Sequence, residues 1–194
     1  MMKPSLPKGT RDFLPEELAR RNFIFKTIAA IFERFGYQGI ETPAMENLSS
    51  LLGKYGDEGD KLLFKVLNNG DFLSKADEEA LDKRNSDQLA VSISKRGLRY
   101  DLTVPFARFA VMHQHELQLP FKRFQIQPVW RGDRPQKGRY REFFQCDADN
   151  VGSASMMADA ETISIINEIL TVLGFKKFNI KINNRINNKQ LFMS

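Results

Sequence analysis

Apolar residues recur at three- and four-residue intervals near the N-terminus, as they do on one face of an α-helix. This spacing predicts an amphipathic helix. Pro15 suits its first turn, the carboxylates of Glu16 and Glu17 complement the positive end of the helix dipole, and Gly36 is a natural stop. The apolar stripe consists of Ile24, Ile28, Ile31, Phe32 and Phe35.

Shorter apolar runs follow this helix. Residues 37–43 form an extended segment that ends in Pro43, which cannot donate to a central ladder. Two strand-like runs are Leu62–Leu67 and Leu98–Leu102, and Asn69-Gly70 after the first run is typical of a tight turn. The polar stretch Ser74–Gln88 between them resembles a surface insertion with a helical turn of its own.

The second half of the chain predicts a helix and then a pair of strands. Thr103 is placed as the helix cap, with Pro105 just inside the first turn. Residues 121–131 and 140–149 have the composition of strands, and the loop of residues 132–139 between them is polar and basic.

The last predicted elements are a helix and a strand. Ser153 or Ser155 caps a helix that ends at Leu173-Gly174. The alternation of Phe178, Ile180 and Ile182 then fits a half-buried strand. Strands that neighbour one another in sequence, with helices at irregular intervals, predict an α+β fold. We expect an antiparallel sheet flanked by helices rather than a doubly wound parallel sheet.

Composition narrows the class of protein without naming a function. A hydrophobic content of 42% supports a real core, and the net charge of +5 favours polyanionic partners. The single cysteine, Cys146, excludes an internal disulfide and a multi-cysteine zinc site; on a strand it is expected to be a small core residue. The sequence has neither a membrane-spanning run of about 20 apolar residues nor a signal-peptide apolar region. A cytoplasmic protein without membrane contact is expected.

The richest chemistry lies in the predicted strand pair, which carries five cations. Arginine forks match phosphate oxygens in bidentate geometry, so this density suits a polyphosphate. Phe143 and Phe144 should point to opposite faces, one inward and one toward a planar base. An exposed basic hairpin with core aromatics explains the same pattern equally well. The cations are Arg131, Arg134, Lys137, Arg139 and Arg141.

A resemblance separates these interpretations. Residues 129–145, with the run RPQKGRYREF, closely resemble motif 2 of class II aminoacyl-tRNA synthetases in the form typical of histidyl-tRNA synthetases. Residues 98–105 are similar to the histidine-binding segment of that family. The other similar segments are Gln145–Asp149, Pro7–Asp12 and the region around residues 35–43, which resembles motif 1.

The resemblance implies a fold, and it covers nearly the whole chain. Residues 1–194 would be the N-terminal part of a class II catalytic domain, with motif 1 at about 16–45, motif 2 at about 121–149 and a polar insertion at about 74–90. The glycine-rich motif 3, the insertion domain and the anticodon-binding domain of the family are not found. The sheet would be incomplete at its C-terminal end, and residues 1–194 alone should be severely impaired in catalysis.

The resemblance also implies roles in ATP binding. Arg131 would bridge the α-phosphate of ATP and the histidine carboxylate, which makes it the expected catalytic residue. Asp133 occupies the acidic position near the adenine amino group, where many relatives have a longer Glu. Phe143 would stack on adenine, and Arg139 would reach the terminal phosphates. Mg²⁺ would offset the charge of the triphosphate.

Besides Arg131, four residues are implied in histidine binding, and each of these four has a structural alternative. Asp101, Thr103 and Gln145 would hold the α-amino group, and Asp149 would accept a hydrogen bond from the imidazole ring. Alternatively, Asp101 and Thr103 cap the following helix, Asp149 pairs with an arginine of the hairpin, and Gln145 satisfies sheet backbone. No protein metal site is expected, because His113 and His115 do not share a helix face.

The implied activity is that of a histidine–tRNA ligase, which forms histidyl-adenylate from histidine and ATP and transfers histidine to tRNA(His). Motif 1 implies a homodimer, with the apolar stripe beside the segment of Ile40 as its surface. Two other functions stay open. One is a catalytically silent paralogue that serves as regulatory subunit of ATP phosphoribosyltransferase, and the other is a basic RNA-binding module.

Overall fold

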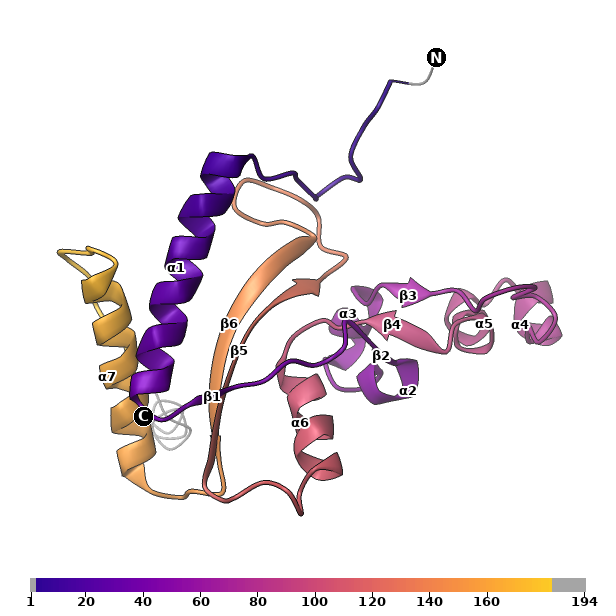
Figure 1. The fold of residues 1–194 in the computed structure, drawn as a ribbon. Coiled ribbons are helices and arrows are strands. Elements are labelled where there is room, and N and C mark those ends of the chain that lie inside the picture. Colours follow the sequence, from indigo (N-terminus) through magenta and orange to yellow (C-terminus); the bar gives the residue numbers. More distant parts are fainter. Residues whose placement is uncertain (1–2, 183–194) are drawn as a thin grey trace, which may run out of the picture.

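The computed structural model describes residues 3–182, which form two small sheets with helices on their faces (Figure 1). The larger sheet has the strand order β1-β5-β6, where β1 spans Gln38–Gly39, β5 Phe121–Trp130 and β6 Glu142–Val151. The smaller sheet has the order β2-β4-β3, with β2 at Met45–Asn47, β4 at Arg96–Leu98 and β3 at Lys65–Val66. All neighbours are antiparallel except β1 and β5, which confirms the predicted α+β class.

The first helix, α1, spans Pro15–Arg34 as the apolar stripe predicts. The Glu17 carboxylate accepts a hydrogen bond from the Leu14 N–H, and Gly36 ends the helix with a φ of 79°. Ile31 and Phe32 are buried, and the Phe32 ring stacks on Phe124 of β5 at 5.3 Å. The inner face of α1 therefore lies on the chain's own core.

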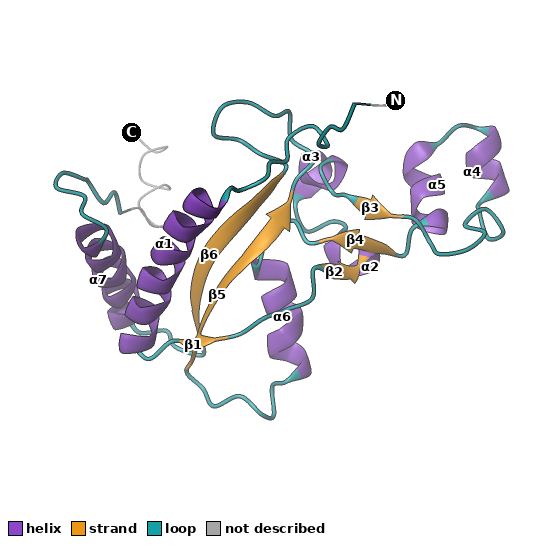
Figure 2. Ribbon diagram, turned by 45° about the horizontal axis from the view of Figure 1, so that its top comes forward, coloured by secondary structure: helices purple, strands orange, loops and turns teal. Residues whose placement is uncertain are grey.

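The last helix, α7, spans Met156–Val172 and lies beside α1 on the same face of the β5–β6 pair, as Figures 1 and 2 show. Its cap is Ser155, whose hydroxyl accepts from the Met157 N–H at 3.2 Å. Ile165 of α7 closes the core between the two helices and the sheet. The predicted position and cap of this helix are confirmed.

The opposite face of β5–β6 is covered by α6, which spans Thr103–Met112 (Figure 2). The prediction that Thr103 caps this helix is wrong: Thr103 is its first residue, and Leu102 precedes it without a side-chain cap. The Asp101 carboxylate instead accepts from the Val104 N–H at 3.1 Å. The helix is therefore capped by Asp101, which lies two residues before its first residue.

The segment between β2 and β4 contains four short helices. They are α2 at Leu48–Leu51, α3 at Gly56–Lys61, α4 at Glu78–Asp82 and α5 at Ser86–Ile93. The stretch predicted as a polar insertion thus contains α4 and most of α5, capped by Asp77 and Asn85. As Figure 1 shows, this part projects away from the larger sheet.

Four local expectations need correction. The run Leu62–Leu67 is a strand only at Lys65–Val66, and Leu98–Leu102 only at Leu98, because each apolar run continues into a turn. Residues 178–182 form no strand, since no neighbouring strand in the described part of the chain pairs with them. Cys146 lies on β6 but is exposed rather than part of the core.

The helices of the described part share one further property. None of those in residues 3–182 is long and apolar enough to cross a membrane.

The packing of α1 on the sheet generates a stability prediction. Phe32→Ala should lower the free energy of unfolding by about 3–5 kcal/mol, because it removes a buried ring that contacts Phe124 and Tyr37. Phe175→Ala, whose ring is 56% exposed, should change it by less than about 1 kcal/mol. Urea unfolding followed by circular dichroism measures both, and equal losses would contradict the assigned core.

Candidate active site

The β5–β6 pair separates polar from apolar side chains. Ten residue pairs join the two strands, from Phe121 opposite Val151 to Trp130 opposite Glu142. Directly opposed residues share a face of a sheet. Phe124, Ile126 and Ala148 face α1 and α7 and belong to the core. The polar face consists of Arg123, Gln125 and Gln127 on β5, opposite Asp149, Asp147 and Gln145 on β6.

Arg123 is the most deeply buried group on this polar face, with an exposure of 0%. Its guanidinium forms an ion pair with the Asp149 carboxylate and lies over the Phe106 ring of α6, 4.3 Å from the centroid. Burial lowers the pKa of Arg123, while Asp149, Asp147 and Asp101 act in the opposite direction. The pair places the Asp149 carboxylate between a buried cation and the open part of the face.

Asp147 is the second carboxylate on this strand face, two residues before Asp149. Burial raises its pKa, Arg123 lowers it, and the negative charges of Asp149 and Asp101 raise it again. Arg131 also lowers it. The carboxylates of β6 and of Asp101 therefore lie close enough to Arg123 and Arg131 for their charges to interact.

Asp101 enters the same region from the loop between β4 and α6. Its Oδ1 atom accepts from the Val104 N–H and, at 3.0 Å, from the Tyr55 hydroxyl. Burial and the neighbouring Asp101 charge raise the pKa of Tyr55, so this phenol is a stable donor. The expected helix-capping contact of Asp101 is therefore present, while the exposed Thr103 contributes no cap.

Arg131 lies just beyond the end of β5 and is fixed by backbone and aromatic contacts. Its Nε donates to the Tyr100 carbonyl at 3.1 Å. The guanidinium lies 4.3 Å from the Tyr100 ring centroid and 5.1 Å from that of Phe143. Within residues 3–182 only Nε of this side chain donates a hydrogen bond, so the terminal nitrogens can meet an anion.

Phe143 and Phe144 point to opposite faces of β6, as the alternation predicts. Phe143 lies on the polar face beside Arg131. Phe144 packs on the other face against Phe25 of α1, with ring centroids 5.0 Å apart. Only Phe143 is therefore placed to meet a ligand of the polar face.

The loop between β5 and β6 brings Asp133 and Arg139 together. Asp133 is only 8% exposed, and its carboxylate accepts from Arg139 at 2.9 Å. Its backbone carbonyl accepts from Arg141 Nε at 3.0 Å. The Arg141 N–H in turn donates to the Gly9 carbonyl at 2.8 Å, so the N-terminal segment packs on this loop.

Several polar atoms of this face are buried without a hydrogen-bond partner in the described chain. They include Oε1 of Gln125, Oε1 of Gln145 and the guanidinium nitrogens of Arg123, whose contact with Asp149 is an ion pair. Buried polar groups are nearly always satisfied, by water or a ligand if not by protein. The free oxygen of Gln145 also disagrees with the alternative that it satisfies sheet backbone. These atoms make the polar face the candidate ligand site.

The structure therefore brings most of the predicted site residues into one region. Arg131, Asp101, Gln145, Phe143 and Asp149 line the polar face or its rim. Asp133 and Arg139 pair with each other in the loop, and Thr103 is exposed at the start of α6. Asp149 does form a structural ion pair, as the alternative supposed, and its partner is Arg123 on strand β5 of the hairpin.

Sequence analysis missed three residues: Arg123, Asp147 and Tyr55. Arg123 and Asp147 could have been predicted, because polar residues alternate with apolar ones along both strands. Pairing the two strands outward from the loop places Arg123 opposite Asp149. Tyr55 gave no such signal. It meets Asp101 only through the tertiary fold, from 46 residues away.

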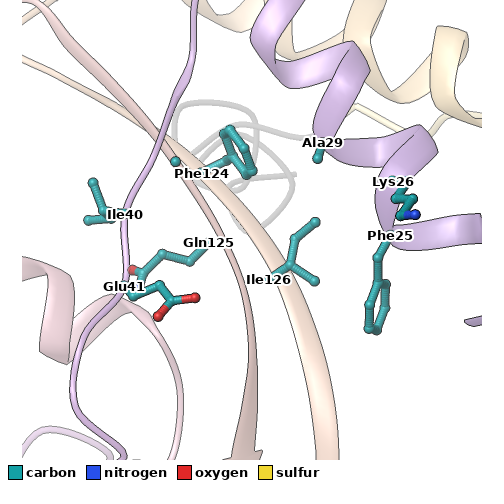
Figure 3. Close-up of a pocket in the computed structure, with 9 residues that line it drawn as sticks. Phe25, Lys26, Ala29, Ile40, Glu41, Phe124, Gln125 and Ile126 are labelled. Carbon is teal, nitrogen blue, oxygen red and sulfur yellow. The ribbon is translucent and has the colours of Figure 1, made fainter. Parts of the chain in front are cut away.

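A separate hollow of about 480 Å³ lies between α1, β5 and the segment after β1 (Figure 3). Phe25, Lys26 and Ala29 line it from α1, and Ile40 and Glu41 line it from the other side. Its walls are mostly apolar and lack the cluster of arginines and aspartates found on the polar face. The hollow therefore shares Gln125 with the polar face but none of the charged residues of the candidate site.

The chain is similar in sequence to known proteins of one family. The sequence model of the family described as histidyl-tRNA synthetase matches residues 9–74 and 86–187. The unmatched residues 75–85 fall within the segment predicted as an insertion. A histidine–tRNA ligase from Christiangramia forsetii is 62% identical over 183 residues, which are 94% of this chain and 40% of the relative. The chain thus spans about 40% of the length of the curated relatives that it matches.

Solved structures give the same picture. Histidyl-tRNA synthetase from Nostoc sp. PCC 7120 is similar with a TM-score of 0.76 and 32% identity, covering 98% of this chain and 39% of that one. A protein from Bacillus halodurans C, described as an ATP phosphoribosyltransferase regulatory subunit/histidyl-tRNA synthetase, has a TM-score of 0.69 and 25% identity, covering 90% of this chain and 40% of its own. The family match over most of the sequence, together with these relatives, shows that the chain belongs to the histidyl-tRNA synthetase family.

Proposed function

We propose that this chain supplies the histidine- and ATP-binding face of a histidine–tRNA ligase. The observation that carries the proposal is the arrangement of Asp101, Asp149 and Arg131 around one polar face that has unpartnered buried atoms. Histidine presents an ammonium group, a carboxylate and an imidazole ring. Two carboxylates and one arginine at separate points of a pocket complement these three groups.

The histidine would lie along β6. Asp101 would accept from the α-ammonium group, together with Thr103 and the free Oε1 of Gln145. Asp149 would accept from the imidazole N–H. The Asp149 carboxylate, with the buried Arg123 behind it, would be a charged acceptor for the ligand side chain. It would reject amino acids with apolar side chains, because these would leave the carboxylate without a hydrogen-bond donor.

ATP would lie at the loop end of the strands. Phe143 would stack on adenine, and Arg131 would bind the α-phosphate. Arg139 would exchange its contact with Asp133 for the terminal phosphates, and the released Asp133 would then be available near the adenine amino group. Because Arg139 is largely exposed in the ion pair, little free energy opposes this exchange.

The reaction would be an in-line displacement at the α-phosphorus. A carboxylate oxygen of histidine attacks, the bond to the bridging oxygen of pyrophosphate breaks, and pyrophosphate leaves with that electron pair. A ribose hydroxyl of tRNA(His) then attacks the acyl carbon and displaces AMP. Arg131 contributes by holding both reactants and by stabilising charge on the five-coordinate phosphorus.

Magnesium would arrive with ATP rather than in a protein cage. Among residues 3–182, no group of three or more His, Cys, Asp or Glu side chains is arranged to hold a metal ion. Mg²⁺ commonly binds through phosphate oxygens with one or two carboxylates, and it supplies neutralisation of the triphosphate charge when bound.

A second function has some support from the similarity to a protein described as an ATP phosphoribosyltransferase regulatory subunit/histidyl-tRNA synthetase. A catalytically silent paralogue has no use for ATP-binding cations. The presence of all five cations in the β5–β6 segment favours the ligase: Arg131, Arg134, Lys137, Arg139 and Arg141.

We also propose a homodimer, with a surface that keeps Ile24 of the predicted stripe but not its buried members. Ile28 and Ile31 of that stripe are buried in the chain's own core and cannot form an interface. The outer side of α1 instead exposes Phe23, at 63%, and Ile24. Ile24 borders a hollow of about 760 Å³ between α1 and the start of β6, and the hollow of Figure 3 lies farther along the helix. Exposed apolar side chains beside such hollows are typical of a subunit interface.

The role of Asp149 predicts a loss of histidine affinity. In a protein of the relatives' full length that carries these residues, Asp149→Asn should weaken histidine binding roughly 10- to 100-fold, since a hydrogen bond to a charged group contributes about 1.5–3 kcal/mol. ATP affinity should change far less. Glu142→Gln, on the other face of the same strand, is the matched control for calorimetric titration. An equal loss for both ligands would remove the specificity role.

The role of Arg131 predicts a loss of rate. Arg131→Lys should slow histidine-dependent ATP–pyrophosphate exchange by about 10²- to 10³-fold, because an ammonium group cannot reproduce the planar fork. Arg84→Lys, at an exposed position between α4 and α5, should retain near-normal exchange. Near-normal activity of Arg131→Lys would disprove the ligase mechanism assigned to this face.

The dimer proposal predicts concentration-dependent assembly. Sedimentation velocity should show a two-fold dimer at tens of micromolar, and Ile24→Asp should shift it toward the monomer because a carboxylate would be buried in the interface. Val111→Asp, at an exposed position of α6, is the control. A wild-type monomer over this concentration range would rule out the proposed surface.

A further inference from the structure

A fully buried guanidinium lies directly behind the carboxylate proposed to read the imidazole ring. Arg123 is 0% exposed, and its guanidinium contacts Asp149 on one side and the face of the Phe106 ring on another. The Asp149 side chain is 38% exposed, so it separates the buried cation from the ligand side of the pocket. The order is thus buried cation, carboxylate and the exposed side of the polar face.

The Arg123–Asp149 pair has charged or titratable neighbours on most of the elements around it. The helix α6 presents the uncharged Phe106 to it, while Arg108 of that helix is paired with Glu46. The remaining groups are Asp147 on β6, Asp101 before α6, Arg131 after β5 and Tyr37 before β1.

The charges of histidine can be matched to these groups. Its ammonium group would face Asp101, and its carboxylate would face Arg131. Asp149 already has its charge balanced by Arg123. A second positive charge on the ligand is therefore not required at the imidazole, and a neutral ring suffices to donate one N–H to Asp149.

We propose that Arg123 is a positioning residue that balances the charge of the Asp149 carboxylate, so that the polar face binds histidine with a neutral imidazole ring. The proposal rests on the proposed function, in which Asp149 accepts from that ring. Arg123 itself does not touch the ligand. It sets which protonation state of histidine the pocket selects.

Removal of Arg123 should reverse this selection. In the open pocket, water still solvates the exposed part of the Asp149 carboxylate. When the bound ring displaces that water, a buried carboxylate would remain without a cation, beside Asp147. Burial strongly disfavours such a charge, so the variant would gain from a protonated, positively charged ring.

The two states differ in how affinity depends on pH. Imidazole has a pKa of about 6.5. If the neutral ring binds, histidine affinity should fall about tenfold from pH 7.5 to 5.5, because free histidine becomes protonated. If the imidazolium binds, affinity should rise about tenfold over the same range. A purely structural arginine would not change the sign of this slope.

Calorimetry in buffers of different ionisation enthalpy measures the proton directly. The protein of full family length that carries these residues should release about half a proton per histidine bound at pH 6.5. Arg123→Met should instead take up about half a proton at this pH. Proton uptake by the wild-type protein would by itself overturn the proposal, whether or not the variant folds.

Three further variants separate charge from packing. Arg123→Lys keeps the cation and should still release protons. The double variant Arg123→Met with Asp149→Asn removes both charges and should restore release, although with weaker binding. Arg108→Met is the control for loss of an arginine that pairs with a different carboxylate, Glu46, and it should lower thermal stability without changing the sign.

The outcomes distinguish this inference from the proposed function. If Asp149→Asn leaves histidine affinity unchanged, the assigned role of Asp149 is wrong. If Asp149→Asn weakens binding while Arg123→Met and the wild type release equal numbers of protons, the function stands and the role of Arg123 is refuted.

Discussion

The antiparallel ladder between β5 and β6 is the constraint on which the rest of this structure depends. Its ten pairs fix a strict alternation, so that one face packs on α1 and α7 while the other gathers arginine, aspartate and glutamine. A register shift of one residue would exchange the two faces and bury the charges in the apolar core. The core and the candidate site are therefore specified by the same set of hydrogen bonds.

A second buried arginine ties the ladder to the smaller sheet. Arg99 is 2% exposed and donates to the carbonyls of Pro128 on β5, Thr42 and Pro43. The next two residues are Tyr100, whose carbonyl accepts from Arg131, and Asp101. Because Arg99 is anchored in backbone acceptors from both sides, the loop that carries Asp101 is held at the rim of the polar face.

The sequence allowed accurate prediction where local periodicity decides the structure. The stripe around Ile31 and the hairpin strands needed only the spacing of residues within one element. Thr103 was misplaced as a cap because the helix begins at Thr103 itself, where the Asp101 carboxylate accepts from the Val104 N–H. Tyr55 could not be found, since its contact with Asp101 depends on how two distant segments meet. Resemblance to a family supplied the candidate ligand-binding residues but not Arg123, which lies behind Asp149.

The polar face costs the fold stability that a purely apolar sheet would retain. Arg123 is fully buried and its guanidinium has the Asp149 carboxylate as its ion-pair partner, and Gln125 and Gln145 each leave an oxygen unpartnered in the described chain. Replacement of buried ion pairs by apolar residues is often neutral or stabilising, so stability alone does not explain Arg123 and Asp149. A ligand with complementary charges would satisfy these groups, and its binding free energy would offset the cost. The presence of Arg123 behind Asp149 is then explained by ligand binding rather than by stability of the fold.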